Sequence, residues 1–275
     1  MWEELSFLED CEHYGEMLAR ESTSNTAIIF GNVFVDCNLH GTDGRVVKLN
    51  GAFVAHHGTF VKNKFTDLNV YPKTLLPNYR EFEESRHFKD CKWYANAIGI
   101  NFNHFFKPYE LFGCRFGITV CEDGWDRDYK DKPIKNIMSY GTDIIMNLSC
   151  SPSTLNKNSS RGRIFSAHAK DNNIPLCYVN SIGLQNNGKT LFTFDGSTVA
   201  YNASGNTITN IDMFSNEYTD VILYKGDLYP LGKMNYNEPS EIQQAYEAII
   251  YAIRKYMEMS GVKKVVIGSS GGKLS

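Results

Sequence analysis

The chain of 275 residues lacks the features that define several large classes of protein. No apolar run approaches the ~18 residues that a membrane-spanning helix needs, and the acidic start, Met1–Leu5, lacks the basic-then-apolar pattern of a secretory signal. The 28 basic and 31 acidic residues are scattered along the chain and leave a net charge of -3. That balance indicates neither a nucleic-acid partner nor a disordered chain. We therefore expect a soluble, cytoplasmic globular protein with no membrane or nucleic-acid partner.

The cysteines lack the spacing of a disulfide framework or of a zinc site. Their number is odd, and no two of them stand in a CxxC pattern. The seven are Cys11, Cys37, Cys91, Cys114, Cys121, Cys150 and Cys177. In a reducing compartment most of them act as small buried apolar side chains. We expect no metal site, and chemistry from one or two of these thiols at most.

Apolar periodicity predicts alternating strands and helices followed by later hairpins. The expected helices cover 3–20, 132–140, 161–170 and 241–259, the last capped by Ser240. The expected strands cover 26–35, 112–120, 143–148, 176–180, 191–194, 197–201 and 264–267, with a hairpin at 51–62. Asp195-Gly196 is interpreted as the turn of a hairpin between 191–194 and 197–201. This order indicates an α/β sandwich with mixed sheets.

The last part of the chain reads as a separate unit. Residues 227–240 carry two prolines and few aliphatic side chains, which is typical of a linker. After them come one helix, one short strand and a glycine loop, which together cannot bury a core of their own. We expect residues 241–275 to begin a second domain.

The strongest local signal for chemistry is Cys121-Glu122-Asp123, directly after the buried strand 112–120. Reactive groups of α/β proteins often lie at such strand ends, although a buried cysteine beside two surface acids has the same local pattern. A second signal is Lys73, which stands between Pro72 and Pro77. Because the prolines restrict the backbone, this lysine is expected to hold a defined position.

Four segments taken together resemble the carbon-nitrogen hydrolase (nitrilase) superfamily, and within it the amidase domain of bacterial glutamine-dependent NAD synthetases. Taken alone, Asn147–Pro152 and Phe194–Thr198 would each be interpreted as an ordinary turn. A single lysine would be interpreted as a surface cation, and a single cysteine as a small buried side chain. The matched motifs are Lys73–Phe88, Cys121–Asp123, Asn147–Pro152 and Phe194–Thr198. The resemblance covers about residues 1–226. The tail, Gly268–Ser275, is similar to the loop with which the synthetase domain of this family binds ATP, except that Leu274 stands where the family has aspartate.

The resemblance implies an α/β fold, a nitrilase-like four-layer α-β-β-α sandwich, followed by the first elements of a Rossmann-like ATP-pyrophosphatase domain. Residues 1–226 would form the carbon-nitrogen hydrolase (glutaminase) domain, 227–240 the linker and 241–275 the beginning of the NAD synthetase domain. The first catalytic glutamate of the family lies before the region where this sequence starts. The sequence is therefore expected to be truncated at both ends.

The resemblance also implies the roles of individual residues. Cys121 would be the nucleophile, Lys73 would stabilise the oxyanion, and Glu81 would position the lysine. We expect Cys121 and Lys73 to meet at the ends of neighbouring strands. The glutamine pocket would be lined by Tyr79, Trp125, Ser151 and Glu122. The remnant of the ATP loop would be Ser270, Gly271, Gly272 and Ser275.

The implied activity is hydrolysis of the glutamine side-chain amide. The ammonia would serve the ATP- and Mg²⁺-dependent amidation of nicotinic acid adenine dinucleotide to NAD. The amidase domain itself needs no cofactor, and the family forms homo-oligomers. Two alternatives stay open: a stand-alone amidase of the nitrilase family, and a catalytically inactive fragment that acts only in binding or oligomerisation.

Overall fold

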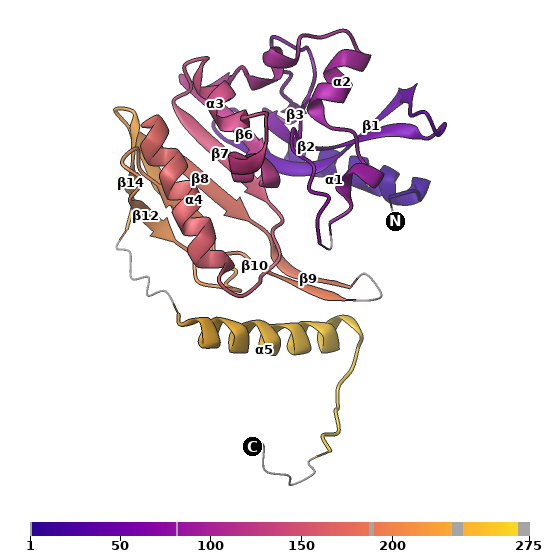
Figure 1. Ribbon diagram of the computed structural model, residues 1–275, viewed down its shortest axis with the longest axis vertical. Coiled ribbons are helices and arrows are strands. Elements are labelled where there is room, and N and C mark those ends of the chain that lie inside the picture. Colours follow the sequence, from indigo (N-terminus) through magenta and orange to yellow (C-terminus); the bar gives the residue numbers. More distant parts are fainter. Residues whose placement is uncertain (1, 81, 187–189, 233–238, 269–275) are drawn as a thin grey trace.

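The computed structural model describes residues 2–80, 82–186, 190–232 and 239–268. Two β-sheets lie face to face, and helices cover the outer face of each sheet (Figure 1). The first sheet is antiparallel and contains β1 (Ala27–His40), β2 (Val46–His56), β3 (Thr59–Phe60) and β4 (Val70–Pro72). In it β2 is central, since it pairs with all three other strands. The hairpin expected at 51–62 is present as β2 and β3.

The second sheet has six strands in the order β12-β11-β8-β7-β6-β5. Their bounds are β5 (Tyr109–Leu111), β6 (Cys114–Val120), β7 (Ile144–Ser149), β8 (Leu176–Asn180), β11 (Val199–Tyr201) and β12 (Thr207–Asn210). The three central strands β6, β7 and β8 run parallel, so their carboxyl ends meet at one edge. The remaining strands form two short antiparallel ribbons. One pairs β9 (Ile182–Asn186) with β10 (Leu191–Asp195), and the other pairs β13 (Val221–Tyr224) with β14 (Asp227–Pro230).

The core between the sheets follows from strand alternation, because successive side chains of a strand point to opposite faces. On β2, Ala52 and Val54 face the second sheet and pack against Ile118 and Val120 of β6. Leu49, on the other face of β2, packs outward. The contact between the two sheets is therefore apolar at its centre.

Helices cover both outer faces. On the first sheet, α1 (Leu5–Arg20) contacts β1 and β2, and α2 (Cys91–Ala97) packs over the outward face of β2. On the second sheet, α3 (Pro133–Met138) and α4 (Lys157–Asn172) enclose a separate apolar cluster centred on Phe165. The layers are α-β-β-α, as the sequence predicted.

The helix α5 (Glu241–Met259) lies across the ribbon of β9 and β10 (Figure 1). Tyr251 stacks on Phe214 with ring centroids 4.3 Å apart, and Gln244 accepts a hydrogen bond from Asn158 at 3.4 Å. The side chains of Ile242 and Ile249 point to solvent. Whether residues 241–275 begin a second domain stays a prediction.

Two local predictions were wrong. Residues 264–267 form no strand, and within the described residues nothing pairs with them, so Val266 is 98% exposed. Asp195-Gly196 does not close a hairpin between β10 and β11: β10 pairs with β9, whereas β11 pairs with β8 and β12. The chain instead passes from the ribbon to the six-stranded sheet at this point. Among the described helices, none is long and apolar enough to cross a membrane.

Candidate active site

Cys121 stands at the carboxyl end of β6, where the strand turns into the 3₁₀ helix η3 (Cys121–Asp128). Its φ of +48° lies in the left-handed region, which a residue other than glycine adopts at a cost. The turn is tight, because a Cβ at Gly124 would come within 2.4 Å of the Phe165 ring. The thiol is half-buried and packs at the end of the core between the sheets. A rigid element therefore carries this thiol, as the sequence predicted.

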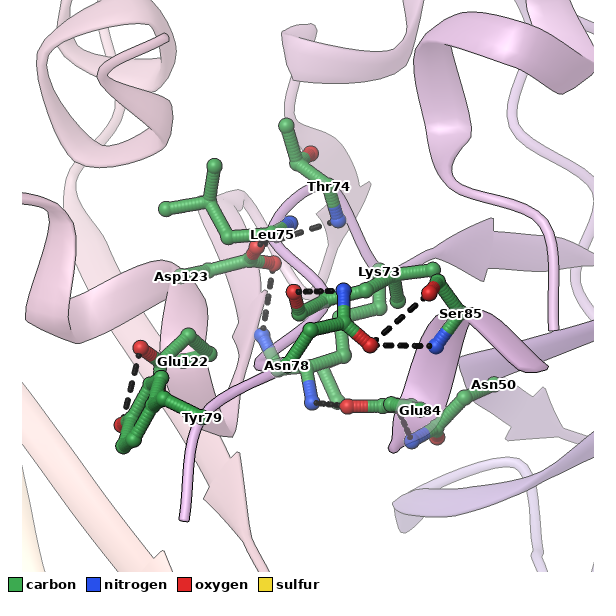
Figure 2. A network of polar contacts seen from close by, with 12 residues as sticks. Asn50, Lys73, Thr74, Leu75, Asn78, Tyr79, Glu84, Ser85, Glu122 and Asp123 are labelled. Atoms are coloured by element: carbon green, nitrogen blue, oxygen red, sulfur yellow. Dashed lines mark hydrogen bonds and ion pairs between the residues drawn. The ribbon is translucent and has the colours of Figure 1, made fainter. Parts of the chain in front are cut away.

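Asp123 joins the turn of Cys121 to the segment of Lys73 (Figure 2). Its Oδ1 accepts hydrogen bonds from the backbone N–H groups of Thr74 at 3.0 Å and Leu75 at 2.8 Å. Its Oδ2 accepts a third, from the N–H of Val120 at 3.0 Å. The carboxyl is fully buried, and burial raises its pKa to about 7 although the three donors and the Lys73 charge oppose this shift. Asp123 is thus a clamp between the two sheets.

Lys73 follows β4 directly, and its side chain is 3% exposed. Its backbone N–H donates to Asn50 at 2.8 Å, and its ammonium forms an ion pair with Glu84. Burial opposes the charged form, but the neighbouring Cys121 and Glu84 outweigh it and raise the pKa of Lys73. The lysine is therefore a fixed cation within electrostatic reach of the thiol. The expectation of neighbouring strands was wrong, since β4 and β6 belong to facing sheets.

Glu84 holds the lysine in place. Besides the ion pair, Glu84 accepts a hydrogen bond from the Asn50 amide at 2.6 Å. Glu81, which the family resemblance predicted in this positioning role, lies outside the described residues. Glu84 belongs to the same motif, eleven positions after the lysine, so the signal that could have found it was present.

Glu122 is buried beneath two phenols. Tyr79 donates to both carboxylate oxygens at 3.1 Å, and Tyr129 donates to Oε1 at 2.8 Å. Burial and the Glu122 charge together raise the pKa of both tyrosines well above the ordinary value. The structure brings Tyr79 and Glu122 together, and it adds Tyr129, which sequence reasoning missed.

A buried polar network fixes Ser151. The Asn180 amide accepts from the Ser151 N–H at 2.8 Å and donates to the Ser151 carbonyl at 3.3 Å. Asn180 also donates to Asp195 at 3.2 Å, and Asp195 forms an ion pair with Arg161 at 3.2 Å. Arg161 and Asp195 are 2% and 1% exposed. The motif at 194–198 therefore holds the Ser151 loop in place through Asn180. Sequence reasoning missed both Arg161 and Asn180.

Lys157, the first residue of α4, is a second cation of the site that the sequence analysis missed. Its ammonium lies 5.9 Å from the ring centre of Trp125 and 6.0 Å from that of Phe82. Burial lowers the pKa of Lys157, while the charges of Cys121 and Glu122 act in the opposite direction. Within the part of the chain that the structure describes, no carboxylate forms an ion pair with Lys157.

The assembled groups are suited to acyl transfer. The Cys121 thiol lies within electrostatic reach of the fixed Lys73 ammonium, and a nucleophile beside a preorganised cation can attack an amide carbonyl. The three described carboxylates nearby are already engaged: Glu84 by the lysine, Glu122 by phenols and Asp123 by backbone donors. Among the described residues no group of three His, Cys, Asp or Glu side chains could hold a metal ion. Ser270, Gly271, Gly272 and Ser275 lie outside the described residues.

Curated proteins similar in sequence match nearly the whole chain. No family model matches the chain. The glutamine-dependent NAD⁺ synthetase of Synechocystis is 27% identical over 279 residues, which cover 97% of this chain and 45% of that relative. The chain thus spans about half the length of the curated relatives it matches.

Solved structures show the same fold. The glutamine-dependent NAD⁺ synthetase of Acinetobacter baumannii, in complex with adenosine diphosphate, superposes with a TM-score of 0.70 at 24% identity, covering 92% of this chain and 42% of that one. A nitrilase-family amidase mutant from Nesterenkonia, with the acetamide moiety of fluoroacetamide added covalently at its active-site cysteine, gives 0.51 at 19% identity, covering 75% and 65%. The chain is thus similar in sequence to glutamine-dependent NAD⁺ synthetases, and it has the α/β fold seen in these proteins and in nitrilase-superfamily amidases.

Proposed function

We propose that this chain is the glutamine-hydrolysing part of a glutamine-dependent NAD synthetase. The observation that carries the proposal is the thiol of Cys121 at the end of β6, tied through Asp123 to the buried Lys73–Glu84 ion pair. The relatives whose names include glutamine dependence match nearly the whole chain. The covalent adduct on the cysteine of the Nesterenkonia amidase supports a nucleophilic role for Cys121.

In the proposed reaction the Cys121 sulfur attacks the side-chain amide carbon of glutamine. The Lys73 ammonium stabilises the negative charge that develops on the amide oxygen, in a position fixed before the substrate arrives. The C–N bond then breaks, ammonia leaves with an added proton, and a thioester remains on Cys121. Water hydrolyses the thioester and releases glutamate.

The two ends of the amino acid have counterparts in the site. Lys157, which has no described carboxylate partner, would bind the α-carboxylate of glutamine. The α-ammonium would lie toward Glu122, whose charge Tyr79 and Tyr129 already orient. Trp125 would form the wall between them, beside the Lys157 ammonium.

The ammonia would serve the amidation of nicotinic acid adenine dinucleotide to NAD, a step that uses ATP and Mg²⁺ in a synthetase domain. Residues 241–275 would begin that domain, and the loop proposed for ATP lies at 268–275. We also propose a homo-oligomeric, cytoplasmic enzyme. These parts of the proposal come from the relatives and from the sequence motif.

The test uses a chloroketone analogue of glutamine, which alkylates a reactive thiol without needing a separate base to complete turnover. We expect one adduct per chain at Cys121, with protection by glutamine and loss of the adduct in Cys121→Ala. Cys114→Ala, which alters a half-buried thiol of the same strand, is the matched control and should retain the adduct. Labelling spread over several cysteines, or unaffected by glutamine, would refute the proposed site.

Turnover of glutamine by this chain alone should be slow. Because the described carboxylates near the thiol are engaged, none is free to take its proton, and a missing general base costs ~10²–10⁴-fold. Ammonia release is the measurement, with short aliphatic amides as competitors. Faster hydrolysis of those amides than of glutamine would favour the stand-alone amidase, which the likeness to the Nesterenkonia enzyme keeps as the second candidate.

A further inference from the structure

Cys121 and Cys150 stand at the ends of adjoining parallel strands. Cys121 follows β6 and Cys150 follows β7, and in the register of this pair Val120 lies opposite Leu148. Cys150 is therefore one residue beyond the position opposite Cys121. For two positions offset in this way, strands ~4.8 Å apart with a rise of ~3.3 Å per residue give a Cα separation of roughly 6 Å. A disulfide needs about 4.4–6.8 Å between Cα atoms.

Both side chains belong to the same side of the sheet. Val120 and Leu148 pack into the core between the sheets, and Cys121 packs against the same cluster. Cys150 comes directly after β7 and two positions after Leu148, so the alternation of the strand, continued by one residue, gives Cys150 the same side. The electrostatics agree, since the charges of both Cys121 and Lys73 act on the Cys150 thiol.

Reagents can reach the pair. Cys150 is exposed, Cys121 is half-buried, and both are free thiols. The other thiol of a neighbouring strand, Cys177 on β8, lies opposite Met146 inside the sheet rather than at its end.

We propose that Cys150 is the resolving partner of Cys121, so that a peroxide converts the two thiols into an intramolecular disulfide. The Cys121 thiolate attacks the O–O bond of hydrogen peroxide, an S–O bond forms, and the hydroxide that leaves is protonated to water. The sulfur loses two electrons to the peroxide. The Cys150 thiolate then attacks the sulfenic sulfur, the S–S bond forms, and the oxygen leaves as a second water.

The disulfide would block the proposed nucleophile and protect it from irreversible oxidation to sulfinic acid. A dithiol reductant would return both thiols by exchange. The proposal needs Cys121 to be a reactive thiol, and it does not depend on which amide Cys121 attacks.

The test is mass spectrometry of the chain after treatment with hydrogen peroxide, alkylation of the remaining thiols and proteolysis. We expect a linked pair of peptides that contain Cys121 and Cys150 and that separate after reduction with dithiothreitol. Cys150→Ala should lose the linked pair, form a dimedone adduct at Cys121 and then accumulate sulfinic acid there. Cys177→Ala is the matched control and should keep the linked pair.

Three results would overturn the proposal. They are a linkage of Cys121 to a different cysteine, equal accumulation of sulfinic acid in the unaltered chain and in Cys150→Ala, and no oxidation of Cys121 at all. Failure of the proposed function is seen separately, as a chain that forms the Cys121–Cys150 link but whose Cys121 does not react with the glutamine chloroketone. Because Cys150 is exposed, Cys150→Ala should fold, and its circular dichroism spectrum checks this.

Discussion

Replacing Asp123 by alanine should destabilise the fold in a way that depends on pH. The change removes the acceptor of three backbone N–H groups, those of Thr74, Leu75 and Val120. Each buried donor left without a partner costs ~1–3 kcal/mol. Water entering the vacated space recovers part of that cost, so we expect a loss of ~3–5 kcal/mol where the Asp123 carboxyl is neutral.

The pH dependence follows from the buried carboxyl. Its pKa is about 7 in the fold, against an ordinary value of 3.8. A carboxyl whose pKa is raised by folding contributes stability that is fully present below pH ~4 and is lost as pH rises through ~7. The loss is on the order of 4 kcal/mol, since each pKa unit is worth ~1.4 kcal/mol. Alanine has no charge to bury, so Asp123→Ala lacks this loss.

Between pH 5 and pH 8 the cost of Asp123→Ala should therefore be largest at pH 5 and should shrink by ~2–3 kcal/mol by pH 8. Urea unfolding, followed by tryptophan fluorescence at pH 5, 6, 7 and 8, measures it. Asp128→Ala changes an exposed carboxylate of the same 3₁₀ helix and is the matched control, with an effect below ~0.5 kcal/mol at every pH. A constant difference across this range, or one no larger than that of the control, would refute the clamp.

Three further predictions concern the charges of the site. Lys73→Met should lower the limiting rate of Cys121 alkylation by the glutamine chloroketone ~10²-fold or more, and an unchanged rate would exclude Lys73 from the reaction. Lys157→Met should raise the half-saturating concentration of that analogue about tenfold with little change in the limiting rate, because a lost charged contact costs ~1.4 kcal/mol. The control is a chloroketone without a carboxylate, which should react equally well with the variant and with the unaltered chain. Asp195→Ala should lower the free energy of unfolding, measured in urea, by ~3–5 kcal/mol, because it leaves Arg161 buried without its ion-pair partner. Removing both charges in Asp195→Ala/Arg161→Met should cost less. A double variant whose loss of stability equals the sum of the two single losses would contradict this.

The sequence was informative wherever local chemistry determines the structure. The apolar run at 112–120 ends in small and acidic residues, and that pattern alone located the Cys121 turn. The prolines around Lys73 likewise indicated a fixed backbone. Each signal is contained in a segment of about a dozen residues, so each could be recognised without knowing which strands pair.

What could not be predicted depends on which strands meet. Asp-Gly at 195–196 has the local signature of a hairpin turn, yet the pairing of β10 with β9 and of β11 with β8 is decided by the sheets around it. The ion pair of Arg161 with Asp195 joins residues 34 positions apart, and no periodicity reports such a contact. Lys157 was missed because a single lysine at the start of a helix has no distinctive pattern.

The two cations of the site are anchored in different ways, and this separates their effects. Lys73 is held within the first sheet by its backbone bond to Asn50 and by its ion pair with Glu84, and the bonds from Thr74 and Leu75 to Asp123 tie its segment to the Cys121 turn. Lys157 is carried by the first turn of α4 and touches the site only through its side chain, beside Trp125. Substitutions at Asp123 should therefore alter stability and reactivity together. Substitutions at Lys157 should alter ligand preference alone, which makes the start of α4 the place where substrate range can change without loss of the fold.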